Sequence, residues 1–458
     1  MNHGHAMTAA GGRGACRAWL GALLSAALLL PGAARAQGPS DEGEPVDAAL
    51  RVRMVTRVSE TLNETYVFPD VAKKMEARLR QRLKAGAYDG FARSGALAAA
   101  LTRDLQDVSR DKHLVLRYAT APHPEQDSPG PGGREQLRRA QARTNFGFQK
   151  LERLTGNVGY LDLRAFRAAE LAGDTAIAAM GFLAHSDALI IDLRWNVGGE
   201  PSMIQLLSSY FFDRPTHLNS FYLRKANTTQ QFWTSAHVPG KRMTDVPLYV
   251  LTSPRTFSAA EEFAYNLKHL KRATLVGETT GGGAHPIETR FLADVRVLAF
   301  IPFGRAVNPI TGTNWEGTGV TPDLQVAADR ALDAAHVEAL KTLRARASDD
   351  ARKARLTWAL QRVEALAAPV TLSPEVLKGL AGTYGDFRLS YEDGSLWCQW
   401  RQELPRSQVI PLSADLFMLD DGMDVFRFRV EKDAAGRVKG LTALFPDGRT
   451  DRLELSGG

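Results

Sequence analysis

The chain has 458 residues, of which 44% are hydrophobic and 24% charged, a balance typical of folded globular proteins. This length predicts two or three domains, and the composition excludes a wholly disordered, collagen-like or coiled-coil chain. The formal net charge is +6, but residues 1–36 hold three arginines and no acidic residue, so the remainder carries only +3. Such a small excess does not support nucleic-acid binding.

Residues 1–36 follow the order of a secretory signal peptide. Arg13 and Arg17 precede an apolar stretch from Ala18 to Leu30, and the sequence Ala-Arg-Ala ending at Ala36 supplies a cleavage motif. The apolar stretch is shorter than the ~20 residues that a spanning helix needs, so we expect cleavage after Ala36. The chain is therefore predicted to be exported, periplasmic or secreted, without stable membrane insertion after signal cleavage.

Changes in hydrophobic periodicity and composition predict five regions after this leader. They are a helical N-terminal domain (45–118), a linker and basic helix (119–144), a core (145–330), a helical segment (331–370) and a β-rich module (371–458). Prolines and glycines between Ala121 and Gly133 mark the linker. Turn sequences ending at Gly394, Gly422 and Gly448 predict that the last module is antiparallel.

The core alternates short apolar strands with helices. Strands are predicted at Val158–Leu163, Ala188–Arg194, Leu248–Thr252, Ala273–Gly277 and Val297–Pro302. Helices are predicted at about Ala168–Ala184, Ser202–Phe212 and Ser258–Leu270. Apolar strands that alternate with helices indicate an α/β layer in which helices cover the sheet.

Several common catalytic motifs are absent from the sequence. It contains no H-E-x-x-H, paired C-x-x-C or G-x-x-x-x-G-K-[ST], and its Gly281–Gly283 loop is not G-x-G-x-x-G. Only Cys398 remains after leader cleavage, which excludes an internal disulfide and a thiolate metal site. We therefore expect no zinc peptidase, P-loop enzyme or Rossmann oxidoreductase, and no metal or cofactor.

Two strand-to-helix turns could carry chemistry. Ser258 follows an apolar strand and opens a helix, whose positive end favours a developing oxyanion; equally, Ser258 could be an N-cap with Glu261 as its capping-box partner. The strand from Leu189 runs into Gly198 and Gly199, whose N–H groups could form an oxyanion hole or simply an ordinary turn.

Four separated motifs resemble one serine peptidase family, which includes the C-terminal processing peptidases, the tricorn core and interphotoreceptor retinoid-binding protein. The motifs are D-L-R-x-N-x-G-G (192–199), T-F-S-A-A-E (256–261), G-E-T-T-G-G-G (277–283) and the stretch 308–323. The resemblance covers about residues 100–326. It implies a Clp-protease/crotonase-like α/β core of ββα units, peptide or protein substrates, and Ser258 as nucleophile.

The family divides over the catalytic base. One branch uses a lysine 25 positions after the serine, but that position here is Gly283, and no lysine lies between Arg272 and Arg296. The resemblance therefore points to the tricorn-like branch with a Ser-His-Glu triad. In that branch His113 corresponds to the base and Glu316 to the carboxylate that orients it.

The same resemblance implies that the N–H groups of Gly198 and Ala259 receive the oxyanion. His285, in the glycine loop, is a rival base or a substrate-loop residue. Residues 119–144 are too few for a PDZ module, which favours the tricorn-like and retinoid-binding-protein-like arrangement. That arrangement also leaves open a non-catalytic protein that binds small apolar ligands on the same core. The oligomeric state is not predicted.

Overall fold

The structure is a computed structural model that describes residues 42–121, 131–400, 405–421 and 426–456. The predicted signal peptide and its cleavage site at Ala36 lie outside the described residues. Within these ranges, no helix is long and apolar enough to cross a membrane.

The N-terminal region, which the sequence predicts to be helical, contains three helices. They are α1 (Ala48–Thr65), α2 (Pro69–Lys84) and α3 (Ser94–Ser109). The Asp47 side chain accepts the Leu50 N–H at 2.6 Å and so caps α1, while Pro69 supplies the fixed φ that suits a first helical position.

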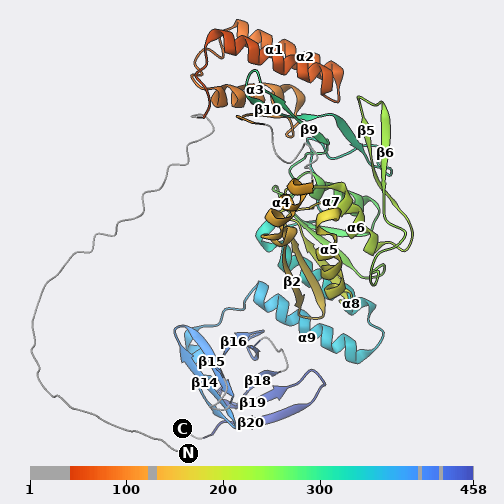
Figure 1. Ribbon diagram of the computed structural model, residues 1–458. Coiled ribbons are helices and arrows are strands. Elements are labelled where there is room, and N and C mark those ends of the chain that lie inside the picture. Colours follow the sequence, from red (N-terminus) through yellow and green to blue (C-terminus); the bar gives the residue numbers. More distant parts are fainter. Residues whose placement is uncertain (1–41, 122–130, 401–404, 422–425, 457–458) are drawn as a thin grey trace, which may run out of the picture. The chain divides into compact units, whose positions relative to one another are not determined.

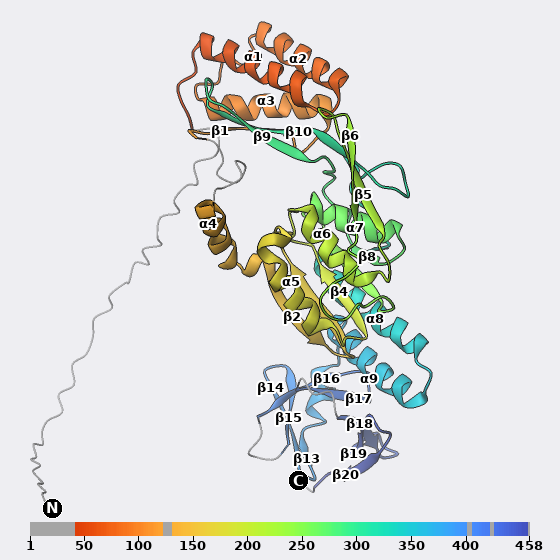
Figure 2. The same cartoon turned by 45° about the vertical axis from the view of Figure 1, so that its right-hand side comes forward.

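A three-stranded antiparallel sheet packs against these helices (Figures 1 and 2). It has the order β1-β10-β9, with bounds β1 (Val115–Tyr118), β10 (Val297–Pro302) and β9 (Ile287–Leu292). Met54, Leu101 and Ile301 belong to one buried cluster. The hydrophobic core of the N-terminal helices is therefore completed by strands that come almost two hundred residues later in the chain.

The main sheet has six strands in the order β12-β8-β7-β4-β3-β2, parallel except for the β2–β3 pair. Its strands are β2 (Phe148–Leu154), β3 (Val158–Leu163), β4 (Ala188–Asp192), β7 (Leu248–Thr252), β8 (Thr274–Gly277) and β12 (Leu324–Gln325). The helices associated with it are α5 (Ala169–Leu183), α6 (Pro201–Ser208), α7 (Ala259–His269), α8 (Ala331–Arg346) and α9 (Asp350–Ala367).

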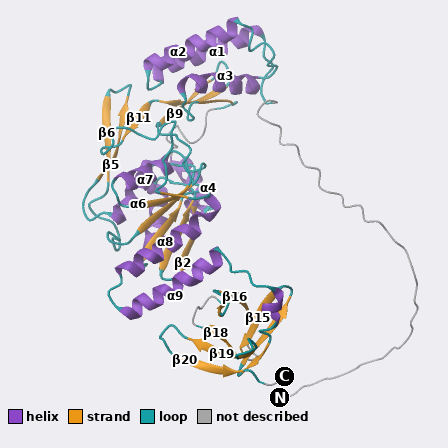
Figure 3. Ribbon diagram, turned by 180° about the vertical axis from the view of Figure 1, so that it is seen from behind, coloured by secondary structure: helices purple, strands orange, loops and turns teal. Residues whose placement is uncertain are grey.

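Helices lie on both faces of this sheet (Figure 3). Alternate residues of β3, β4, β7 and β8 are buried against the two helical layers. Leu189 and Ile191 of β4 pack with α5, α6 and α7, whereas Ala188 and Ile190 pack with α8 and α9. Helices on both faces explain why the strands are apolar without interruption. This arrangement confirms the predicted α/β core.

The remaining core strands form a separate antiparallel sheet, β11-β5-β6. Its bounds are β5 (His217–Leu223), β6 (Thr228–Trp233) and β11 (Gly304–Val307), and the other helical elements are α4 (Pro131–Ala142), η1 (Asn145–Gly147), η2 (Ser209–Phe211), η3 (Ala328–Arg330) and α10 (Pro374–Lys378). The sequence analysis did not predict β5, β6 or β11, because their exposed faces are polar.

The C-terminal β-rich module is an eight-stranded antiparallel meander, as the turn sequences predict. Its strands are β13 (Gly382–Tyr384), β14 (Phe387–Glu392), β15 (Ser395–Trp400), β16 (Ser407–Pro411), β17 (Leu416–Asp420), β18 (Arg427–Lys432), β19 (Val438–Leu444) and β20 (Thr450–Glu454). A bridge between Tyr384 and Leu455 joins its two ends. The predicted turn at Gly422 lies partly outside the described residues.

The shared N-terminal core generates a first prediction. Ile301 is 1% exposed and lies in β10, within the cluster that covers α1 and α3. Ile301→Ala is expected to lower the free energy of unfolding by about 3 kcal/mol, because it leaves a cavity. Urea denaturation measures the change. Val52→Ala, at a 51% exposed position of α1, is the control and should change stability by about 0.5 kcal/mol or less. Equal effects of the two substitutions would contradict the packing described.

Candidate active site

A cavity of about 470 Å³ collects side chains from distant parts of the chain beside the start of α7. Its lining includes Ser258, His113, His285, Glu262, Phe257 and Val197. Four of the predicted site residues therefore share one cavity, since Ala259 lines it as well, at the carboxyl ends of the parallel strands. This edge is where open α/β sheets place their ligands.

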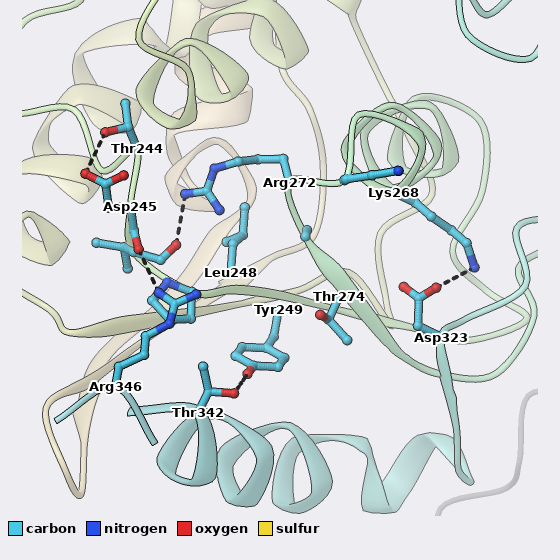
Figure 4. Close-up of a pocket in the computed structure, with 14 residues that line it drawn as sticks. Thr244, Asp245, Leu248, Tyr249, Lys268, Arg272, Thr274, Asp323, Thr342 and Arg346 are labelled. Atoms are coloured by element: carbon cyan, nitrogen blue, oxygen red, sulfur yellow. Dashed lines mark hydrogen bonds and ion pairs between the residues drawn. The ribbon is translucent and has the colours of Figure 1, made fainter. Parts of the chain in front are cut away.

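A larger cavity, of about 740 Å³, lies at the amino ends of β7 and β8 (Figure 4). Three of its four cations, Lys268, Arg272 and Arg346, are already engaged. Lys268 contacts Asp323 at 2.9 Å, and Arg272 donates to three backbone carbonyls, including that of Met243 at 2.6 Å. These contacts hold loops in place, so the Ser258 cavity is the better candidate for catalysis.

Ser258 has an unusual backbone conformation. Its φ of 55° and ψ of −123° are rarely adopted by a residue other than glycine, and such strain is concentrated at functional sites. Hydrogen bonds on both sides hold it there: Phe257 N–H donates to the Asn196 carbonyl at 3.0 Å, and Ser258 N–H donates to Glu261 at 2.8 Å. The serine is thus fixed at the positive end of α7.

The Glu261 carboxylate connects this turn to the glycine loop. Besides the Ser258 N–H, it accepts the Thr280 hydroxyl at 2.5 Å and the N–H groups of Gly282 and Gly283 at 2.6 and 2.9 Å. Glu261 is completely buried, and burial raises its pKa while these four donors oppose the rise. A capping role for Glu261 is therefore compatible with a catalytic role for Ser258.

The predicted oxyanion donors lie close to Ser258. Gly198 has a φ of 107°, and a Cβ there would stand 2.8 Å from the Ser258 Cβ, so only glycine fits. Its N–H donates to the Asn196 side chain at 2.9 Å, which the sequence did not indicate. Ala259 N–H is the first amide of α7, and Gly199 lines the cavity. Ala259 is therefore the better placed donor in this conformation.

His113 packs against the serine turn. Its ring centroid lies 4.7 Å from that of Phe257, and a Cβ on Gly283 would stand 2.7 Å from its Cε1 atom. Burial, reinforced by the neighbouring His285, lowers the pKa of His113 to about 4 against the opposing charge of Asp111. The imidazole is neutral at neutral pH, and its Nδ1 is buried without a hydrogen-bond partner.

His285 belongs to a buried hydrogen-bonded cluster with two carboxylates. Its Nδ1 lies 2.7 Å from Asp111 and 3.5 Å from Glu316. Asp111 also accepts the Tyr66 hydroxyl at 3.2 Å and, through its other oxygen, the His113 N–H at 3.0 Å. The sequence analysis missed Asp111 as a site residue, although it lies two positions before His113.

Glu316 is the second carboxylate of this cluster. One of its oxygens accepts the Ala284 N–H at 2.6 Å, and the other, Oε1, is buried without a partner. Burial raises the pKa of Glu316, the Asp111 charge raises it further, and His285 opposes both. Across the described residues, no hydrogen bond joins Ser258 to either imidazole, or His113 to Glu316. The structure thus brings the predicted triad to one place without closing it.

The cluster of Asp111, His285 and Glu316 also has the composition of a metal site. One ligand atom from each lies within 4.8 Å of the others, and an imidazole with two carboxylates can bind zinc. However, the His285 Nδ1 is engaged with Asp111, and Asp111 also accepts from Tyr66. The contacts among these side chains are those of a hydrogen-bonded network.

Comparison with known proteins gives two matches to related family models. One, described as Peptidase family S41, matches residues 157–326, and the other, the N-terminal domain of Peptidase_S41 in eukaryotic IRBP, matches residues 49–144. Together they span more than half of the chain. The first contains Ser258, His285 and Glu316, and the second contains His113.

Solved structures of several peptidases are similar at low identity. The photosystem II D1 C-terminal processing protease is 14% identical, with a TM-score of 0.40, covering 61% of this chain and 94% of that one. Mature CPAF is 12% identical, with a TM-score of 0.47, covering 64% and 97%. The tricorn protease is 13% identical, with a TM-score of 0.39, covering 63% and 35%. Likenesses this distant carry no argument about activity.

The four bonds to Glu261 generate a second prediction. In Glu261→Gln, an amide group replaces an oxygen that accepts two N–H or O–H donors, so buried donors lose their acceptor. The free energy of unfolding is expected to fall by about 3 kcal/mol, measured by urea denaturation. Glu170→Gln, on the exposed surface of α5, is the matched control and should be nearly neutral. A neutral Glu261→Gln would show that this carboxylate does not hold the turn.

The lowered pKa of His113 generates a third prediction. Because this pKa is about 4 in the folded state and about 6.5 in the unfolded chain, the unfolded chain binds more protons between these values. This group therefore removes stability as the pH falls from 6.5 towards 4. In His113→Asn, which does not titrate, the free energy of unfolding should decline less between pH 7 and pH 5 than in the parent. If the free energy of unfolding, measured by urea titration, has the same pH dependence in the parent and in His113→Asn, the lowered pKa of His113 is refuted.

Proposed function

Because this chain belongs to peptidase family S41 and is a serine-type peptidase, we propose that it cleaves peptide bonds through a Ser258-His113-Glu316 triad. The observation that carries the proposal is the shared cavity, in which a conformationally strained serine at a helix N-terminus lies with a neutral histidine. A neutral imidazole can accept the serine proton directly, whereas a protonated one cannot.

Two unpaired buried atoms support the choice of His113 as base. His113 Nδ1 and Glu316 Oε1 are both buried without a partner, and a bond between them is the one that a Ser-His-Glu triad needs. With Nδ1–H donated to Glu316, the other ring nitrogen, Nε2, is the acceptor for the Ser258 proton. A rearrangement on substrate binding that joined these two atoms would satisfy both, since apo sites often tighten only in the complex.

The proposed reaction then proceeds by acyl transfer. Ser258 Oγ attacks the substrate carbonyl while its proton passes to His113 Nε2, and the developing oxyanion is received by Ala259 N–H at the start of α7. Gly198 N–H contributes once its bond to Asn196 opens. The imidazolium protonates the leaving amine, and a water molecule activated by His113 hydrolyses the acyl-enzyme.

His285 serves in this scheme as a positioning residue. Its Nδ1 is held by Asp111, and Asp111 also fixes the His113 backbone, so His285 and Asp111 set the place of the base. The predicted leader suggests that peptide or protein substrates are met outside the cytoplasm. The binding-protein alternative is disfavoured, because the cavity contains Ser258, two histidines and Glu262 rather than an apolar lining alone.

The triad generates a fourth prediction, measured as kcat/KM on unfolded casein or quenched peptides. Ser258→Ala and His113→Ala are each expected to lose at least ~1000-fold, because nucleophile and base act as one unit. His285→Ala should lose no more than ~100-fold, because it acts through other residues. If His285→Ala loses as much as Ser258→Ala while His113→Ala does not, His285 is the base. Full activity of Ser258→Ala would overturn the mechanism.

A further inference from the structure

The Ser258 cavity contains a second carboxylate that the triad does not use. Glu262 lies in α7, one turn beyond Ser258, and its N–H bonds to the Ser258 carbonyl at 3.0 Å. The side chain lines the cavity although the residue is only 3% exposed. A buried carboxylate next to a nucleophile therefore contacts the space that a substrate side chain would enter.

Glu262 has no cationic partner in the structure. No lysine or arginine lines the cavity, and within the described ranges no ion pair involves this carboxylate. Burial raises the pKa of Glu262 to about 7, against the opposing effect of the Asn219 and Asn266 amides. A buried carboxylate without a cation is costly, and such groups cluster at functional sites.

The two amides beside Glu262 are also incompletely satisfied. Asn219, on β5, and Asn266, one turn further along α7, are completely buried. Both polar atoms of the Asn219 side chain and the Asn266 Nδ2 have no hydrogen-bond partner. The two amides act on the Glu262 carboxylate but make no well-formed hydrogen bond with it, so the three side chains form a buried polar group with unused hydrogen-bonding capacity.

The rest of the cavity suits a long side chain with a polar end. Phe221, Phe257, Ile287 and Val197 supply apolar walls, and Glu262 supplies an anionic group. The volume of about 470 Å³ exceeds that of any single side chain. Lysine and arginine have apolar stems that pack on such walls, and charged ends that carry three and five donors.

Resting on the proposed peptidase function, we propose that Glu262 determines substrate specificity, and that its cavity takes a lysine or arginine side chain next to the scissile bond. The charged end of the substrate donates to Glu262 and to the Asn219 oxygen. Asn266 positions the carboxylate from the other side. The enzyme therefore cleaves beside basic residues.

The direct test uses peptide-coumarin substrates that differ only in the residue before the amide bond: arginine, lysine, glutamine or leucine. In the parent, kcat/KM for arginine or lysine should exceed that for leucine at least tenfold. In Glu262→Gln, the arginine-to-leucine ratio should fall at least tenfold. Glu200→Gln, which alters an exposed carboxylate of the same cavity, is the matched control and should keep the ratio.

Each other outcome overturns the inference. A parent that prefers leucine or glutamine shows that the cavity does not select a cation. A ratio that changes in Glu200→Gln but not in Glu262→Gln places selectivity at the rim. Fluorophosphonate labelling of each variant shows whether Ser258 is still reactive, so a misfolded variant is recognised. If a variant does misfold, the substrate preference of the parent still tests the inference.

A binding measurement separates this inference from the proposed function. Agmatine, which carries the arginine guanidinium without a scissile bond, is titrated calorimetrically into Ser258→Ala and into the Ser258→Ala, Glu262→Gln double variant. The affinity should fall at least tenfold in the double variant. Agmatine binding without hydrolysis by the parent would support the cation site and refute the peptidase mechanism. Hydrolysis by the parent without agmatine binding or a preference for arginine would support the peptidase mechanism and refute the cation site.

Discussion

The site depends on one buried carboxylate with four hydrogen bonds. Glu261 accepts donors from the Ser258 turn and from the glycine loop at Thr280, Gly282 and Gly283, the two segments that follow the paired strands β7 and β8. Because Glu261 is buried, the loss of any one of these hydrogen bonds would lower the free energy of unfolding substantially. The strained backbone of Ser258 is tolerated because these bonds leave the turn no alternative geometry.

The fold places the other candidate site residues beside this turn, from the main sheet and from the N-terminal region. The parallel sheet ends beside α7, whereas His113 and Asp111 arrive from the N-terminal region just before β1. Because β1 pairs with β10, which in turn pairs with β9, the segment carrying His113 is anchored to the sheet formed by the strands that follow His285. The relation between Ser258 and the proposed base His113 therefore depends on an antiparallel pairing outside the main sheet, and changes in that pairing would reach the candidate site.

Much of the fold and part of the candidate site could be predicted from the sequence, for physical reasons that can be named. Uninterrupted apolar strands predicted β3, β7 and β10 with their observed bounds, because burial on both faces leaves a strong signal. The half-exposed strands β5 and β11 gave none, and Asp111 could not be assigned because its partners, Tyr66 and His285, are far away in sequence. Likewise, the Asn196 bond to Gly198 N–H depends on side-chain orientation, which no pattern encodes. The predicted domain boundaries stay predictions.

The central claim is that Ser258 is an activated nucleophile. Intact-mass analysis after treatment with a fluorophosphonate, followed by peptide mapping, tests it most directly, because this reagent labels only serines whose hydroxyl a base has activated. We expect a single adduct on Ser258 in the folded parent, and none in Ser258→Ala. A folded parent that takes up no label, or that carries it on another residue, would contradict the claim.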